Sequence, residues 1–176
     1  MAEVTILGID PGSRITGYGI VKMEKSRAAH VVSGCIRVGD LPMAKRLKTI
    51  YESLVEIVTD YAPDQVAIEK VFMSKNPDSA LKLGQARGAA MVACATKDLP
   101  IFEYSANEIK QAIVGRGHAD KEQIQHMVNA LLATNEQQAD AADALAAAVC
   151  HGHTADGIAA LALRSAQPAR RRRSAP

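Results

Sequence analysis

The chain has 176 residues, of which 48% are hydrophobic and 23% are charged, and its formal net charge is +2. This length suits one domain that buries its core without disulfides or a structural metal, and the widely spaced Cys35, Cys94 and Cys150 exclude a disulfide framework and indicate reduced, buried thiols. The N-terminus has no basic segment and no run of 18 apolar residues occurs, so we expect a cytoplasmic protein.

The first part of the sequence predicts strands followed by a helix. Three stretches rich in Val, Ile and Tyr, at residues 5–10, 16–23 and 29–38, predict consecutive antiparallel strands. Over residues 43–61 the apolar residues recur at intervals of three and four, which predicts an amphipathic helix that Pro63 ends. The apolar run that begins at residue 65 then predicts a buried strand.

The second part of the sequence adds one strand and several helices. A helix over residues 79–97 is apolar almost all round, with Ala80, Gly84 and Gly88 along one edge, so it must be covered on more than one side, by this chain or by a second copy. A strand follows at 100–105, and Ser105 with Glu108 forms a capping box that starts a short helix. Two further helices are predicted at 120–133 and 138–150. Together these elements predict an α/β domain with a five-stranded mixed sheet, three antiparallel strands and then two parallel ones, flanked by helices.

The C-terminal end is strongly basic. Arg164 and Arg170 to Arg173 lie in the last 13 positions, which contain no acid, so residues 1–163, with 16 basic and 19 acidic side chains, carry a net charge of −3. Bulk charge therefore gives no support to nucleic-acid binding by the body of the protein, which would need local basic patches and bound metal. We expect residues 156–176 to form an extension ending in a disordered tail, either simply solvated or in contact with phosphates.

Four carboxylates stand out. Asp10 ends the first strand before a Pro-Gly turn, Glu69 follows a buried strand, and Asp140 and Asp143 share one face of an alanine-rich helix. Taken singly, each acid also fits an ordinary turn, a solvent-facing strand end or a solvated helix face. If they converge, they suit hard divalent ions such as Mg²⁺, as in a two-metal phosphodiesterase site where one ion positions a water and the other stabilises the leaving 3′-oxygen.

At these residues the sequence resembles the bacterial RuvC Holliday junction resolvases. The similar strings are LGIDPGSRITGYGIV, AIEKVFMSKNPDSALKLGQARG and QADAADALA, and the match runs in order over about residues 4–155. The resemblance implies a ribonuclease H-like nuclease domain over residues 1–155. It assigns Asp10, Glu69, Asp140 and Asp143 as catalytic residues and metal ligands, although some relatives have a His where this chain has Asp140.

The resemblance also implies the reaction and its partners. The substrate would be a four-way DNA junction in recombination and repair, cut by a homodimer that makes paired symmetric nicks in strands of like polarity and leaves 5′-phosphate and 3′-hydroxyl ends. Mg²⁺ or Mn²⁺ would be required, with two ions in each active site. The branch-migration proteins RuvA and RuvB would be partners.

A second group of residues is expected to hold DNA. Phe72, three residues after Glu69, either plugs the core or stacks on a base near the scissile phosphate, and the resemblance favours stacking. Candidates for phosphate contact near the strand ends are Lys75, Lys82, Arg87, Lys110, Arg116, Lys121, Ser13 and Arg14. Each basic residue could equally be ordinary surface charge, and the resemblance favours Lys110 and Lys121. His151 and His153 form a weak candidate metal pair that better suits a helix end.

Two other functions are compatible with parts of the pattern. The turn after Asp10, with Gly17 and Gly19, resembles the phosphate loop of sugar-kinase and actin-like ATPases, but such enzymes need two domains of this kind. A non-catalytic junction-binding protein would need the basic loops and Phe72 but no carboxylate cluster. Cleavage of a four-way junction that depends on Mg²⁺ distinguishes the nuclease from both.

Overall fold

The chain is built around one mixed sheet. The structure, a computed structural model, describes residues 3–71, 76–115 and 119–154. The strands are β1 (Val4–Asp10), β2 (Ile15–Glu24), β3 (Arg27–Arg37), β4 (Gln65–Glu69) and β5 (Ile101–Tyr104). Their order is β3-β2-β1-β4-β5, in which β1, β2 and β3 pair antiparallel while β4 and β5 continue the sheet in parallel. The expected five-stranded mixed sheet is confirmed.

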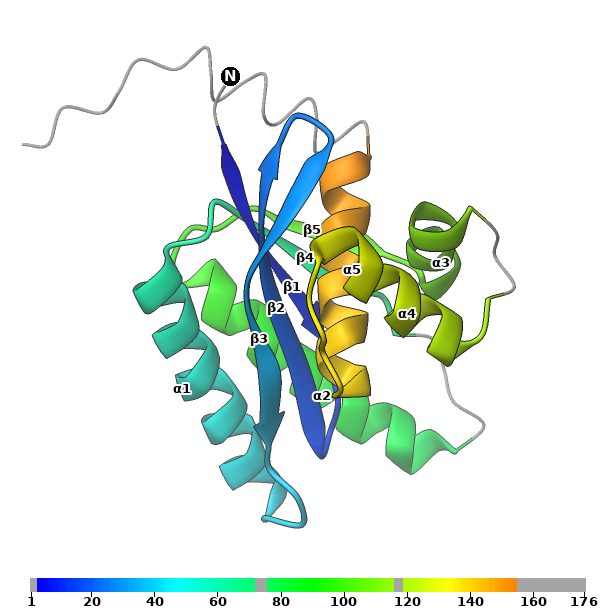
Figure 1. Cartoon of the computed structure of the whole chain (residues 1–176). Coiled ribbons are helices and arrows are strands. Elements are labelled where there is room, and N and C mark those ends of the chain that lie inside the picture. The colour runs from blue at the N-terminus through cyan, green and yellow to red at the C-terminus, as the bar shows by residue number, and fades with distance from the viewer. Residues whose placement is uncertain (1–2, 72–75, 116–118, 155–176) are drawn as a thin grey trace, which may run out of the picture.

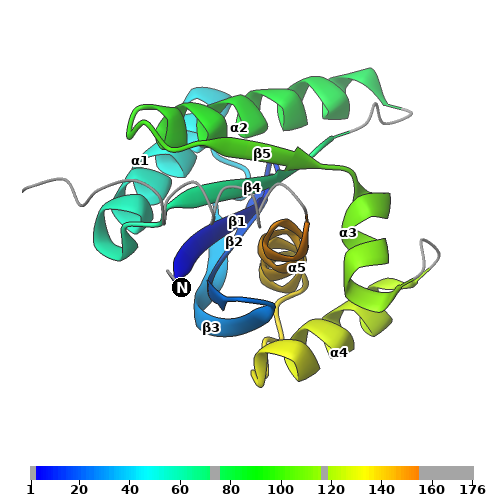
Figure 2. The ribbon, with the colours of Figure 1, turned by 90° about the horizontal axis from the view of Figure 1, so that it is seen from above.

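Helices cover both faces of the sheet. The helices are α1 (Met43–Tyr61), α2 (Pro77–Ala95), α3 (Ala106–Val114), α4 (Lys121–Leu132) and α5 (Ala139–His153). Figure 2 shows α1 and α2 on one face and α5 on the other, with α3 and α4 packed outside α5 (Figure 1). Two apolar clusters, one on each side of the sheet, form the core.

The helix starts follow the local sequence signals in most cases. The capping box at Ser105 and Glu108 is present at the start of α3, as expected. Asn76 caps α2 by accepting hydrogen bonds from the next residues, so α2 begins at Pro77, two residues earlier than predicted. By contrast, α5 starts after Gln138 with no side-chain cap hydrogen bond.

The helix α5 packs unusually close to the sheet. A Cβ atom at Gly8 of β1 would lie 1.9 Å from the carbonyl oxygen of Ala144, and one at Gly17 of β2 would lie 1.9 Å from that of Asp140. Glycine on the strands and alanine on the helix therefore let the two backbones meet almost directly. This packing brings the first turns of α5, with Asp140 and Asp143, to the sheet.

Within the described residues, α2 packs against α1 and β5 and leaves one of its faces exposed. Its buried residues are Ala86, Ala90, Ala93 and Cys94. Leu81 and Val92 are 69% and 53% exposed, and the positions of Gly84 and Gly88 open onto free space. The sequence predicts that α2 is buried on more than one side. The described part of the chain does not bury it in this way.

Two smaller expectations concern the cysteines and membrane helices. All three cysteines are free, Cys94 and Cys150 are buried as predicted, and Cys35 is half-buried. None of the helices in the described ranges has the length and apolarity needed to cross a membrane.

The close packing of α5 predicts that Gly8→Ala destabilises the protein. The new methyl group would meet backbone atoms of α5, which cannot move independently of the helix, so we expect a loss of about 2–3 kcal/mol in the free energy of unfolding. Urea denaturation followed by circular dichroism measures this loss. Lys45→Ala, at an exposed position of α1, is the control and should change the same quantity by less than about 1 kcal/mol. Equal effects of the two substitutions would contradict the prediction.

Candidate active site

Two of the four carboxylates are neighbours in the sheet. Ile9 and Ile68 pair in register on the parallel strands β1 and β4, so the next residues, Asp10 and Glu69, lie side by side at the ends of these strands. A hydrogen bond joins the two side chains. Both are half-buried, at the edge where the strands end.

The other two carboxylates reach this edge from α5. Asp10 pairs with Gly17 on β2, and the backbone of Asp140 lies directly against Gly17. Asp143, one turn further along α5, lines a pocket of about 350 Å³ together with Asp10 and Glu69. Asp140 does not line this pocket, but its charge acts on both Asp10 and Asp143. The structure thus brings the four predicted acids from three chain segments to one end of the sheet.

Burial and mutual repulsion make these carboxylates poor acids. Burial, and then the charges of Glu69, Asp143 and Asp140, raise the pKa of Asp10 to about 8. The pKa of Glu69 is also raised, first by burial and then by Asp143, although its hydrogen bond with Asp10 acts in the opposite direction. Burial likewise raises the pKa of Asp143, while Lys121 counteracts this effect. At neutral pH a proton on Asp10 therefore relieves part of the repulsion.

Lysines supply the opposite charge in the pocket. Lys121, at the start of α4, places its Nζ 3.4 Å from a carboxylate oxygen of Asp143, and this carboxylate raises the pKa of the lysine. Lys110 of α3 also lines the pocket and acts on Glu69 and Asp143. Lys70 is a third lining lysine that our sequence reasoning missed, although its position directly after Glu69 was a usable signal.

Four other residues that the sequence predicts to contact DNA lie in the described part of the chain but do not line the pocket. They are Arg87, Lys82, Arg14 and Ser13. Arg87 of α2 forms an ion pair of 2.8 Å with Glu103 and donates from Nε to the carbonyl oxygen of Glu69 at 3.3 Å. It therefore holds the end of β4. Lys82 pairs with Asp78, one turn earlier on α2.

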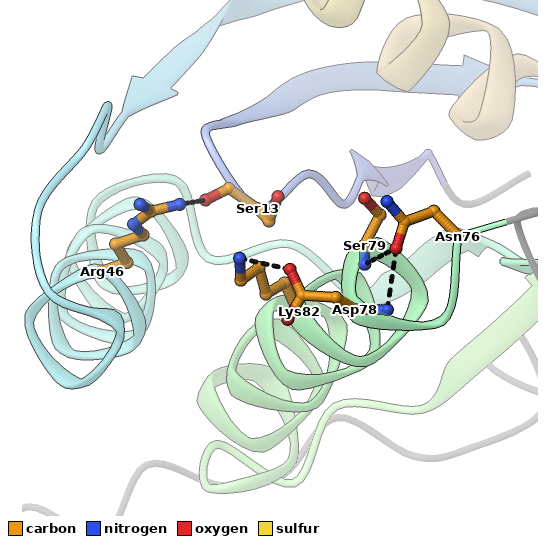
Figure 3. A network of polar contacts seen from close by, with 6 residues as sticks. All are labelled: Ser13, Arg46, Asn76, Asp78, Ser79 and Lys82. Atoms are coloured by element: carbon orange, nitrogen blue, oxygen red, sulfur yellow. Dashed lines mark hydrogen bonds and ion pairs between the residues drawn. The ribbon is translucent and has the colours of Figure 1, made fainter.

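The turn between β1 and β2 carries Ser13 and Arg14. Arg14 forms a 2.7 Å ion pair with Asp40, and the carbonyl oxygen of Ser13 accepts a 3.1 Å hydrogen bond from Arg46 of α1. Figure 3 draws this turn between α1 and the capped first turn of α2, where Asn76, Asp78, Ser79 and Lys82 lie. No sequence pattern indicates that Arg46 binds this turn. The side chain of Arg14 is exposed and accessible to a ligand.

Some predicted residues lie outside the described part of the chain. These are Phe72, Lys75, Arg116 and the extension from residue 156 onward.

The two histidines at the end of α5 have structural partners. His151 is fully buried, and its ring nitrogens lie 2.7 Å from the Tyr104 hydroxyl and 2.8 Å from Oε1 of Gln65. His153 Nε2 lies 3.2 Å from the carbonyl oxygen of Ser26. The helix-end role is therefore the better interpretation.

Across residues 3–71, 76–115 and 119–154, no three His, Cys, Asp or Glu side chains are already spaced to hold one metal ion.

The raised pKa of Asp10 predicts how stability depends on pH. In the absence of divalent ions, the folded protein keeps the proton on Asp10 up to pH about 8, because its pKa is raised, whereas the unfolded chain loses this proton near the ordinary pKa of 3.8. The folded protein thus loses stability as the pH rises through this window. Asp10→Asn removes the titration, so in EDTA we expect the variant to exceed the native protein in unfolding free energy by roughly 1–2 kcal/mol at pH 8.5.

Urea denaturation at pH 8.5 and pH 5 measures this difference. The gain from Asp10→Asn should shrink at pH 5, where most of the native protein's loss has not yet occurred. Asp60→Asn, on the exposed end of α1, is a control for removing one carboxylate far from the site. If Asp10→Asn raised the unfolding free energy by the same amount at both pH values, the raised pKa of Asp10 would be contradicted.

Comparisons with known proteins agree with this geometry. The family model described as crossover junction endodeoxyribonuclease RuvC matches residues 6–151. Proteins of that name from Marinobacter nauticus and Vibrio cholerae are 58% and 56% identical to this chain over 158 residues, which is 89% of this chain and 90% and 91% of theirs.

Solved structures give the same result for the fold. The Thermus thermophilus RuvC in complex with a Holliday junction substrate superposes with a TM-score of 0.81 and 31% identity, covering 88% of this chain and 96% of that one. The yeast mitochondrial Holliday junction resolvase shares the fold at a TM-score of 0.61 with 11% identity, covering 82% of this chain and 76% of its own. The chain belongs to the RuvC family of crossover junction endodeoxyribonucleases.

Proposed function

We propose that this protein is a Holliday junction resolvase that nicks two strands of like polarity in a four-way DNA junction and leaves 5′-phosphate and 3′-hydroxyl ends. The observation that carries the proposal is the pocket in which Asp10, Glu69 and Asp143 meet beside Lys110 and Lys121. Acidic and basic groups at one sheet edge suit a phosphodiester, because the acids can hold cations while the lysines face the phosphate. Membership of the RuvC family supports the same reaction.

The carboxylates fit hard divalent cations. Oxygen donors are the ligands that Mg²⁺ and Mn²⁺ prefer, and a cation would remove the repulsion that raises the pKa of Asp10. Asp10, Glu69 and Asp143 would hold two ions, with Asp140 as a further ligand from the first turn of α5. Bound divalent ions lower the pKa of a water and neutralise developing charge on the phosphate. Asp143 would have to exchange or share its contact with Lys121.

The remaining residues would bind and orient the DNA. Lys110 and Lys121 reach into the pocket and would contact phosphates next to the scissile bond. Phe72 would stack on a neighbouring base. Arg14, Lys75, Lys82 and Arg116 would extend the contact with phosphates away from the pocket. For Arg87 and Ser13, the ion pair with Glu103 and the hydrogen bond from Arg46 favour supporting the site over direct contact with DNA.

We also propose a homodimer. Two cuts in strands of like polarity need two active sites related by a twofold axis. The uncovered side of α2, with Leu81 and Val92 exposed and Gly84 and Gly88 opening onto free space, suits close approach of the same helix from a second copy. The family resemblance adds RuvA and RuvB as partners. The sequence itself suggests the cytoplasm as the location and residues 156–176 as an extension of the nuclease domain.

The central prediction is that Asp10→Asn abolishes junction cleavage but leaves junction binding intact. Asparagine keeps the size of the side chain but lacks the charge that holds a cation, so the rate should fall at least about 1000-fold. Single-turnover cleavage of a labelled four-way junction with Mg²⁺ measures the rate, and gel shift in EDTA measures binding.

Asp60→Asn is the matched control and should cleave at the native rate. Normal cleavage by Asp10→Asn, or equal cleavage by the native protein in EDTA, would refute the metal-dependent nuclease. ATP turnover without junction cleavage would favour the ATPase interpretation instead.

The dimer predicts a mass in solution of twice the 18.7 kDa chain. Multi-angle light scattering at micromolar concentration measures this mass, and Leu81→Glu should shift it towards the monomer, since a charge would be buried on the uncovered side of α2. Leu41→Glu, at an exposed leucine before α1, is the control. A native protein that is monomeric under these conditions would contradict the proposal.

A further inference from the structure

The loop between α4 and α5 is tied to the sheet by one acidic residue that the proposed reaction does not use. Glu136 lies two residues before Gln138, which precedes the first residue of α5. Its carboxylate oxygen Oε2 accepts a 2.5 Å hydrogen bond from the Ser33 hydroxyl on β3, 103 residues away in the sequence. Its other oxygen, Oε1, accepts a 2.8 Å hydrogen bond from the backbone N–H of Gln138.

A bulge in β3 presents Ser33 for this contact. The register between β2 and β3 shifts so that Ile20 faces Val32 while Val21 faces His30, which leaves Val31 as the extra residue. An extra residue brings side chains three apart to the same side of a strand. Accordingly, His30 Nε2 lies 3.0 Å from the Ser33 oxygen, which donates its own proton to Glu136.

The backbone of Glu136 is held from the opposite side by α4. Its N–H donates to Oδ1 of Asn129 at 2.8 Å, and its carbonyl oxygen accepts from Gln125 at 2.9 Å and Asn129 at 3.1 Å. Glu136 therefore connects β3, α4 and the start of α5. Its neighbour Gln137 bonds only within the loop, to Asn135, among the contacts found in the described residues.

The N-terminus of α5 needs support from residues outside the helix. Gln138 provides no side-chain cap, so the first turn, where Asp140 lies, lacks the usual local support. Glu136 accepts a hydrogen bond from the backbone N–H of Gln138. Arg37 of β3 donates a hydrogen bond of 2.9 Å to the side-chain oxygen of Gln138. Both contacts act two residues before Asp140 and five before Asp143.

We propose that Glu136 is a positioning residue that fixes the first turn of α5, and with it Asp140 and Asp143, relative to Asp10 on the sheet. This inference rests on the proposed function, in which these acids hold divalent cations. Groups that orient metal ligands change metal affinity when they are removed, because the ligands then sample unproductive positions. A residue that only stabilised the fold would lower the melting temperature and leave the metal affinity of the folded protein unchanged.

The test compares three variants with the native protein. Glu136→Ala removes both acceptors, whereas Glu136→Gln keeps an oxygen for the Gln138 N–H and offers an N–H to Ser33. Gln137→Ala alters the adjacent residue without touching the connection to β3. Free Mn²⁺ measured by electron paramagnetic resonance gives metal affinity without any reaction, and thermal unfolding in EDTA identifies the temperature range in which every variant is folded.

We expect Glu136→Ala to bind Mn²⁺ about tenfold more weakly. Glu136→Gln should stay within about twofold of the native affinity, and Gln137→Ala should match it. Native Mn²⁺ affinity in folded Glu136→Ala would overturn the proposal, as would a loss in Glu136→Gln as large as that in Glu136→Ala, because charge rather than hydrogen bonding would then be responsible.

Two further variants keep the outcomes separate. If Glu136→Ala does not fold, Ser33→Ala, which removes the sheet end of the same connection, must weaken Mn²⁺ binding, and native affinity in that variant overturns the proposal. Asp10→Asn reports on the metal site itself. Loss of Mn²⁺ binding in Asp10→Asn with native binding in Glu136→Ala rejects the positioning role alone, whereas native Mn²⁺ binding in Asp10→Asn contradicts the proposed metal site.

Discussion

Repulsion between like charges is the constraint on which this structure depends. Asp10, Glu69 and Asp143 line one pocket, and partial burial strengthens the repulsion because water screens it less. Chain segments that were free to move would separate these groups. The fold prevents this in two ways: the parallel pairing of β1 with β4 fixes Asp10 beside Glu69, and the close packing of α5 on two strand glycines fixes the helix that carries Asp143.

The residues around the carboxylates either neutralise their charge or support their backbone. Lys121 approaches Asp143, and a proton on Asp10 allows the hydrogen bond with Glu69. Arg87 binds the carbonyl oxygen of Glu69, and Glu136 binds the N–H of Gln138 ahead of α5. The two supports lie on opposite sides of the sheet, so each of the two segments that approach β1 at the site is held by a long-range polar contact.

Local patterns predicted most of the fold. Apolar periodicity predicted the strands and α1, because such a pattern reflects which side of an element faces the core. A capping box predicted the start of α3, and the all-round apolar composition of residues 79–97 predicted α2. The four acids were identifiable because they interrupt apolar segments. The contacts of Arg87 with Glu103 and of Ser33 with Glu136 were not predictable, since they join residues distant in sequence. The Ser33 contact also depends on a bulge in β3 that no local pattern indicates. From the sequence alone, Arg87 is therefore a candidate DNA contact.

Charge balance links metal binding to protons at this site. At neutral pH Asp10 carries a proton in the folded protein, because burial and the neighbouring acids raise its pKa to about 8. A divalent ion needs the ionised carboxylate, so binding must release that proton and also weaken the hold of Lys121 on Asp143. The proton and the ammonium group thus compensate the same negative charge that the cations would compensate. The repulsion that makes the site costly to fold therefore also favours cation binding, provided that the supports keep the carboxylates from moving apart.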